Sequence, residues 1–148
     1  MARGSKKTPE DVLAEHKQLA QDVAAVDDWA ATGTPRNSSW GAEMSKRAAT
    51  AVEHLKHHFG GKAEQELFED FLERSPHLSD RLKKLTAEHA VIIHELKDVA
   101  EQSKKAAGKE LDRVARKARA AVALLRRHEA EENELILRSV FDDVGVGD

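Results

Sequence analysis

The chain has 148 residues, the length of one domain, and it contains no run of 18 or more apolar residues that would span a membrane. Apolar residues make up 40% of the chain, which is enough for one core, and the net charge of -3 argues against a dedicated nucleic-acid binder. Eight histidines occur beside no cysteine and no tyrosine, which excludes disulfides, thiolate metal sites and tyrosyl chemistry. Any metal ligands must therefore be nitrogen and oxygen atoms.

The N-terminal segment, residues 1–7, is short, basic and polar and lacks the apolar stretch of a signal peptide. We therefore expect a flexible N-terminus and a cytoplasmic protein. A helix start follows at Thr8-Pro9-Glu10-Asp11, with a capping threonine, a proline in the first turn and two acids near the positive end of the helix dipole. This first helix is expected to end in residues 32–37, a turn by composition.

A second helix is expected to begin near Ser38 or Ser39 and to be interrupted at Gly60-Gly61, because two adjacent glycines cost a helix roughly 2 kcal/mol against alanine. A further helical piece ends at Ser75-Pro76, and a third helix follows until about residue 104. A fourth helix is expected from about Lys109 to Val140. Residues 142–148 are acidic and glycine-rich and are expected to form an irregular tail, which leaves residues 8–141 as the domain.

Apolar residues recur at alternating spacings of three and four along these segments, which is the pattern of helices with one apolar stripe each. Four long helices joined by short connections favour an antiparallel bundle. The sequence therefore predicts an all-α fold, an up-down-up-down four-helix bundle whose second helix is interrupted at Gly60-Gly61.

Four histidines fall within the apolar stripes, one on each predicted helix. An imidazole in an apolar interior costs free energy unless its nitrogens are hydrogen-bonded or bind a metal. One such histidine is ordinarily a satisfied core residue, but four on four helices favour a shared site. A glutamate in the same stripe, four residues after the last histidine, projects from the same helix face. In an antiparallel bundle all five reach one level, which predicts a transition-metal site formed by His16, His58, His89, His128 and Glu132.

The segments around these residues resemble the hemerythrin-like (HHE cation-binding) family, from about Pro9 to Phe141. The resemblance implies a four-helix bundle with a non-haem di-iron site that binds O2 or a related small ligand. It also implies two iron ions joined by oxo and carboxylate bridges, with the fourth helix supplying a histidine and the bridging carboxylate, here His128 and Glu132. The segments that carry the resemblance are Leu13-Ala14-Glu15-His16, Leu55-Lys56-His57-His58-Phe59, Leu85-Thr86-Ala87-Glu88-His89 and His128-Glu129-Ala130-Glu131-Glu132.

The second predicted helix departs from the family pattern, because Lys62 occupies the position of the expected glutamate four residues after His58. Three replacements are open. Glu64 reaches the site if the glycine pair slips the helix, and we favour it. Glu66 lies about 12 Å beyond His58 on a straight helix, and His54 pairs with His58 at a spacing of four and offers a nitrogen instead.

The third predicted helix departs as well, because Ile93 occupies a position where the family often has histidine. His94 is one residue further and becomes a ligand only if the helix is bulged. Ferritin-like sites need Glu-x-x-His, and zinc proteases need His-Glu-x-x-His; neither motif occurs in the chain.

The apolar residues one turn from the predicted ligands are expected to wall a pocket for the small ligand: Leu19, Leu55, Ile92 and Leu125. The leading hypothesis is a protein that binds or senses O2, nitric oxide or peroxide, or that handles iron. Two alternatives stay open: a di-iron enzyme that removes peroxide or nitric oxide, and a bundle with a degenerate metal site and a structural or interaction role. We expect no nucleic-acid or membrane partner, and a monomer or small homo-oligomer.

Overall fold

The computed structural model describes residues 8–146, without the side chains of residues 62–64 and 139–146. The predicted flexible N-terminus, residues 1–7, lies outside the described residues. Within them the chain is all-helical, as predicted, and forms no strand. The elements are α1 (Pro9–Ala31), α2 (Ser38–Phe59), α3 (Lys62–Arg74), the short 3-10 helix η1 (Pro76–Leu78), α4 (Ser79–Lys105) and α5 (Lys109–Val146).

The first two helices begin at side-chain caps that satisfy the free amides of a helix start. The Thr8 hydroxyl accepts a hydrogen bond from the Asp11 amide at 3.1 Å, and the Asp11 carboxylate accepts one from the Thr8 amide at 3.0 Å. This reciprocal pair is a capping box. At the start of α2 the Asn37 side chain accepts a hydrogen bond from the Trp40 amide at 3.0 Å. Both helices thus begin where the sequence predicts.

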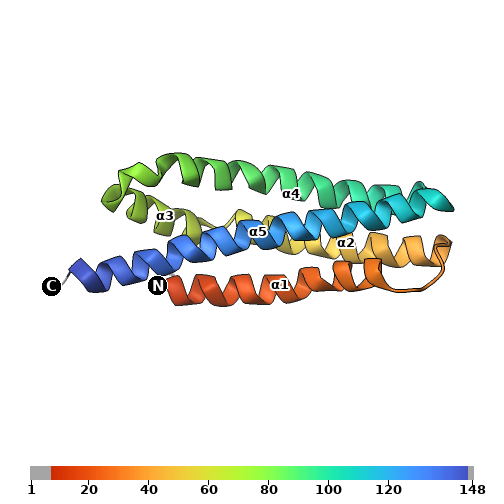
Figure 1. The fold of residues 1–148 in the computed structure, drawn as a ribbon, viewed down its shortest axis with the longest axis horizontal. Coiled ribbons are helices and arrows are strands. Elements are labelled where there is room, and N and C mark those ends of the chain that lie inside the picture. Colours follow the sequence, from red (N-terminus) through yellow and green to blue (C-terminus); the bar gives the residue numbers. More distant parts are fainter. Residues whose placement is uncertain (1–7, 147–148) are drawn as a thin grey trace, which may run out of the picture.

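The predicted interruption at the glycine pair is present, between the end of α2 at Phe59 and the start of α3 at Lys62. The Gly60 amide still donates to the Lys56 carbonyl at 3.0 Å, but Gly61 is extended, with φ -73° and ψ 139°. Both glycines have a negative φ, so the helix does not end in a left-handed residue. It ends because the ψ of Gly61 is extended. As a result α3 leaves the line of α2 and lies against the start of α4 (Figure 1).

The C-terminal end differs from the expectation, because α5 continues to Val146. Residues 142–146, expected in an irregular tail, are therefore helical, while residues 147–148 lie outside the described residues. Asp142, Asp143 and Val144 have ordinary helix propensities, so the helix reaches the first glycine, Gly145, before it meets an unfavourable residue.

The long helices pack side by side as a bundle, with α1 and α4 each in contact with both α2 and α5 (Figure 1). α2 approaches α4 closely at Gly41, where a Cβ atom would overlap the Ser103 carbonyl group. Next to it the Ser45 hydroxyl donates to the Ala100 carbonyl at 2.8 Å. Among the described residues, no helix is long and apolar enough to cross a membrane.

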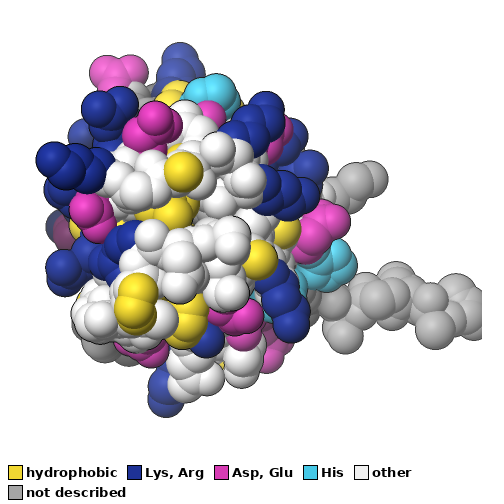
Figure 2. Space-filling model, turned by 90° about the vertical axis from the view of Figure 1, so that its right-hand side faces the viewer, with side chains coloured by type: hydrophobic (Ala, Val, Ile, Leu, Met, Phe, Trp, Pro, Cys, Tyr) yellow, Lys and Arg dark blue, Asp and Glu magenta, His cyan; other side chains and the backbone are white. Residues whose placement is uncertain are grey.

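The end of the bundle with the α1–α2 and α4–α5 connections has a mixed surface (Figure 2). Acidic and basic side chains are interspersed around it, and hydrophobic side chains form only small separate patches on this face. The apolar side chains are mostly inside, in two core clusters. The larger extends from this end to Leu19, Leu55, Ile92 and Leu125, and the smaller contains Phe71, Leu78, Leu82, Leu85 and Leu135. A layer of polar side chains lies between the two clusters.

Candidate metal centre

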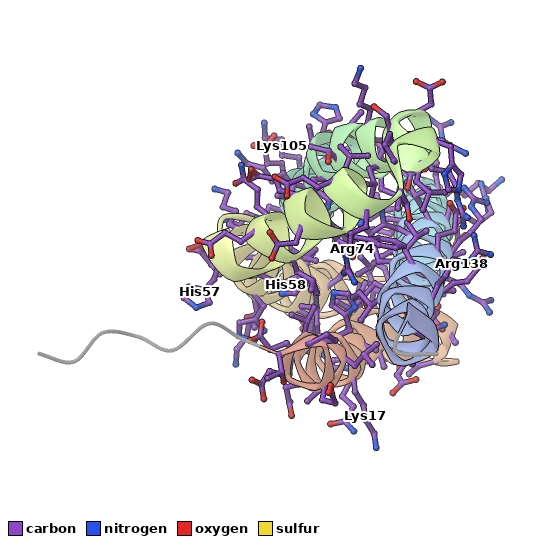
Figure 3. The ribbon with its side chains drawn as sticks, turned by 90° about the vertical axis from the view of Figure 1, so that its left-hand side faces the viewer. Lys17, His57, His58, Arg74, Lys105 and Arg138 are labelled. Carbon is purple, nitrogen blue, oxygen red and sulfur yellow. The ribbon has the colours of Figure 1, made fainter. Side chains whose placement is uncertain are left out.

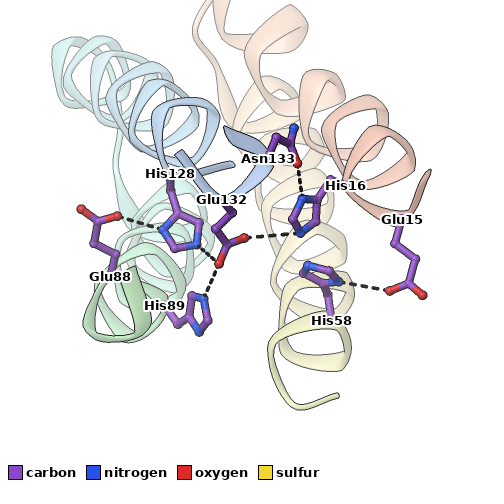
Figure 4. A network of polar contacts seen from close by, with 8 residues as sticks. All are labelled: Glu15, His16, His58, Glu88, His89, His128, Glu132 and Asn133. Carbon is purple, nitrogen blue, oxygen red and sulfur yellow. Dashed lines mark hydrogen bonds and ion pairs between the residues drawn. The ribbon is translucent and has the colours of Figure 1, made fainter. Parts of the chain in front are cut away.

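The polar layer is built from histidines and glutamates of four helices (Figure 4). Four of its members are at most 5% exposed, and burying such groups is costly unless each is hydrogen-bonded, paired or bound to a ligand. The layer contains His16 on α1, His58 on α2, His89 on α4, and His128, Glu129 and Glu132 on α5.

These six residues form two groups of three, each with a metal-ligand arrangement. In each group one nitrogen or carboxylate oxygen from every residue lies within 4.8 Å of the others. The first group comes from α1, α2 and α5, and the second from α4 and α5. The groups are His16, His58 and Glu129, and His89, His128 and Glu132.

Glu132 lies between the two groups (Figure 4). Its Oε1 is 3.3 Å from Nε2 of His16, and its Oε2 is 3.3 Å from Nε2 of His89 and 3.0 Å from Nε2 of His128. A single carboxylate thus faces imidazoles of both groups, which is the placement that a bridging carboxylate needs.

Three of the imidazoles contact a side-chain oxygen of another residue through Nδ1. Nδ1 of His128 is 2.8 Å from the Glu88 carboxylate, Nδ1 of His16 is 2.6 Å from the Asn133 side-chain oxygen, and Nδ1 of His58 is 3.4 Å from the Glu15 carboxylate. Because each partner atom is an oxygen acceptor, Nδ1 carries the proton and Nε2 presents its lone pair to the interior. Metal-binding histidines in proteins are commonly oriented in this way.

Burial and neighbouring charges shift the protonation of two residues in the layer. Burial raises the pKa of Glu129 to about 7, although His16 and His58 oppose the shift. Burial lowers the pKa of His128, but its contacts with Glu132 and Glu88 outweigh this and leave it raised. Burial thus favours the neutral form of Glu129, whereas the carboxylates beside His128 favour the charged form of that imidazole.

Three acceptor atoms in the layer test whether a cation fits. Nε2 of His128, Oε2 of Glu129 and Oε1 of Glu132 are buried and have no hydrogen-bond donor among the described residues. A buried acceptor without a donor costs free energy, and a bound cation beside it lowers that cost. The donor set, imidazole nitrogen and carboxylate oxygen, suits first-row transition metals. The residues therefore fit a metal centre.

The structure brings five of the predicted ligands together: His16, His58, His89, His128 and Glu132. It does not bring His54 to them, since that side chain is 46% exposed and its Nδ1 pairs with Asp22 at 3.1 Å. The side chain of Glu64, our preferred replacement ligand, lies outside the described residues. Glu66 and His94 are exposed.

Figure 3 shows the two adjacent histidines at the end of α2 on opposite sides of the helix. His58 points into the bundle and has a side chain 7% exposed, whereas His57 is exposed. Phe59 follows, and its ring stacks on His89 with ring centres 3.8 Å apart and planes 8° apart. The phenyl ring therefore covers one side of the second group.

Glu129 was not among the ligands that the sequence predicts. It directly follows His128 and was not assigned to the apolar stripe, but it is 5% exposed because α5 is buried against both α1 and α4. The signal was its spacing: Glu129, Glu132 and Ile136 recur at three and four residues, which places them on one helix face.

A cavity of about 580 Å³ lies beside the second group, lined mainly by α3 and α4. His89 and Glu132 form part of its wall, and the His89 side chain is 24% exposed. The four apolar residues expected to wall a ligand pocket do not line this cavity. Instead they belong to the larger core cluster, on the other side of the polar layer: Leu19, Leu55, Ile92 and Leu125.

A comparison with protein families matched residues 8–140 to the hemerythrin HHE cation-binding domain. Comparisons with curated proteins and with solved structures gave no match. The matched range covers all four helices that contribute to the polar layer, and that layer contains the histidine and glutamate groups that a cation-binding domain requires. The chain belongs to the hemerythrin HHE cation-binding family.

Proposed function

We propose that the polar layer holds two iron ions and that the protein uses them to bind O2 or a related small ligand, nitric oxide or peroxide. The observation that carries the proposal is Glu132, whose two oxygens face imidazoles of both groups. In this arrangement His16, His58 and Glu129 would hold one ion, His89 and His128 would hold the other, and Glu132 would contribute to both. The choice of iron comes from the family, and nitrogen and oxygen ligands suit it.

An iron pair supplies the electrons and the open coordination positions that binding or reduction of such ligands requires. The residues of the chain supply the rest. Glu88 and Asn133 orient the imidazoles of His128 and His16, and the larger core cluster excludes water on one side of the layer. The cavity beside His89 gives the small ligand a route to the second ion.

The proposal includes the arrangement of the whole domain. Residues 8–141 form one up-down-up-down four-helix bundle, with α2 and α3 together as its second helix. Each of the four helices then contributes at the level of the metal ions, as the positions of the ligands on α1, α2, α4 and α5 support.

A second candidate is an enzyme that consumes peroxide or nitric oxide at the same centre. The cavity favours it, because the second group faces a space open to exchange with solvent, whereas a reversible carrier protects its centre from water and protons. Rapid peroxide or nitric oxide consumption by the iron-loaded protein distinguishes the enzyme from the carrier.

The test is iron loading of the purified chain, measured as iron per chain together with the near-ultraviolet absorption of a bridged iron pair. We expect close to two irons per chain. His128→Ala is expected to lose the iron of the second group while retaining its helix content, and His57→Ala, a change at an exposed histidine, is expected to keep both irons. A wild-type protein that stays free of iron after reconstitution overturns the proposal and supports a bundle with a degenerate site.

A further inference from the structure

The cavity between α3 and α4 is far larger than the ligands discussed above. Its volume is about 580 Å³, whereas one water molecule occupies about 30 Å³ in the liquid and diatomic ligands are of similar size. Pockets that bind organic ligands typically measure about 300–1,000 Å³. The cavity therefore has the volume of a site for an organic molecule.

The walls of the cavity are apolar on the inside. Two phenylalanines and three leucines line it, and Leu82 and Leu85 among them are no more than 8% exposed. An apolar wall of this kind gains free energy when it covers the hydrocarbon part of a ligand. The large apolar lining residues are Phe59, Phe68, Leu72, Leu82 and Leu85, and Ala87 adds a methyl group.

The polar lining residues divide between the two ends of the cavity. Gln65, Glu69, Lys83 and Thr86 are exposed side chains at its mouth. The Glu69 carboxylate and the Lys83 ammonium group have opposite charges that cancel, so the mouth favours neither anions nor cations. At the inner end the lining includes His89 and Glu132 of the metal centre.

We propose that this cavity binds one uncharged, largely apolar organic molecule, with its inner end against the His89 edge of the metal centre. The body of the molecule packs among the phenylalanine and leucine side chains, and its outer end lies at the mouth between Glu69 and Lys83. Binding in the cavity is independent of the proposed function, whereas an effect of the bound molecule on the iron centre rests on it.

Two probes with the same ring system test the binding. N-phenyl-1-naphthylamine is uncharged, and 8-anilino-1-naphthalenesulfonate adds a sulfonate; both fluoresce strongly in apolar surroundings. For the uncharged probe we expect one site per chain with a dissociation constant on the order of 1–10 µM. We expect the sulfonate to bind at least about tenfold more weakly, because its charge has no counterpart in the apolar interior.

Two tryptophan substitutions on α4 locate the site. Thr86→Trp fills the mouth from an exposed position and is expected to weaken binding of the uncharged probe by about tenfold or more. Val91→Trp is the matched control, because Val91 is 51% exposed and does not line the cavity. It is expected to leave the dissociation constant unchanged within about twofold. Far-ultraviolet circular dichroism checks that both variants are folded.

Equal binding by Thr86→Trp and the wild type, or tighter binding of the sulfonate, overturns the proposal. The iron content of the same samples separates this result from failure of the proposed function. If a chain that takes up no iron binds the probe, the proposed binding in the cavity stands and the proposed iron centre is overturned. An iron-loaded chain that does not bind the probe supports the iron centre and overturns the proposed binding in the cavity. In the iron-loaded protein, bound probe is expected to slow the binding of nitric oxide, followed by absorption.

Discussion

Glu129 and Glu132 are three residues apart on α5 and differ in the histidines that they approach. Glu132 contacts imidazoles in both groups, whereas Glu129 belongs to the group of His16 and His58. A buried carboxylate is tolerated when it is protonated or compensated by positive charge. Because burial raises the pKa of Glu129 to about 7, the residue is protonated below that pH in the metal-free protein, and it must lose this proton to bind a cation.

Glu129→Gln removes the carboxylate charge but preserves the size of the side chain. We expect the variant to bind about half as much metal as the wild type, because His16 and His58 then keep only a neutral amide beside them. Metal per chain, measured after dialysis against trace metal, checks this. Glu131→Gln on the same helix is the control, since Glu131 belongs to neither group. Wild-type metal content in Glu129→Gln would assign the residue a purely structural role.

The raised pKa of Glu129, about 7 against an ordinary value of 4.5, gives the metal-free protein a pH-dependent stability. Between these values the folded state holds a proton that the unfolded chain has released, so the free energy of unfolding falls as pH rises, by up to about 3 kcal/mol. His128 acts in the same direction, because its raised pKa gives a contribution that is present below 6.5 and lost as pH rises through the folded value.

Urea unfolding of the metal-free protein between pH 4.5 and 8 measures this dependence, and Glu129→Gln is expected to show a smaller fall. Metal binding has the opposite dependence and strengthens as pH rises, because the ligands must lose their protons. A metal-free protein that becomes more stable across this pH range would contradict the assignment.

At the scale of the helices, Gly61 determines where α2 ends and Gly41 determines how closely α2 approaches α4. The extended Gly61 ends α2 directly after the segment His58-Phe59, so that the phenyl ring can stack on His89 and α3 can turn toward α4. Gly41 allows α2 to approach the α4 backbone at Ser103. This approach sets the spacing of the two helices at the end of the bundle with the α1–α2 and α4–α5 connections.

Gly41→Ala tests the close approach, because the added methyl group overlaps the Ser103 carbonyl group and the helices must separate. Overpacking of this kind costs about 1–3 kcal/mol, and we expect that loss in the free energy of unfolding. Gly33→Ala is the control, since a Cβ at Gly33 meets no atom within 4 Å. Equal stability of the two variants would mean that the α2–α4 spacing adjusts at no cost.

At the scale of the whole molecule, the polar layer separates the chain into two hydrophobic clusters. Polar side chains replace apolar ones in this layer, so it lacks apolar packing and contains buried acceptors without donors. A cation bound by four helices links the clusters and compensates these acceptors. Metal binding and folding stability are therefore coupled.

Removal of the metal with a chelator is expected to lower the melting temperature. Metal present at 100 times its dissociation constant stabilises the fold by about 2.7 kcal/mol, which corresponds to roughly 5–10 °C for a chain of this length. Calorimetry with and without chelator measures the shift. His128→Ala, which lacks a ligand of the second group, is expected to show a smaller shift, and a shift as large as that of the wild type would place the stabilising metal elsewhere.

The sequence by itself determined the helices and the level at which His16, His58, His89, His128 and Glu132 meet. Helix caps, glycine interruptions and apolar spacing are local properties, and local hydrogen bonding and propensity decide them. The end of α5 was predicted six residues too early, since acidic residues near a glycine-rich end do not stop a helix before the glycines themselves.

Only the tertiary structure decided which residues act together. Glu129 is buried because α5 packs against both α1 and α4. One apolar stripe in the sequence does not reveal that a helix has two neighbours. His54 has the spacing of a ligand, but its helix face turns it toward Asp22 at the surface. The cavity between α3 and α4 depends on the direction in which α3 leaves Gly61. These features arise from the relative positions of helices, which the packing of the whole chain sets.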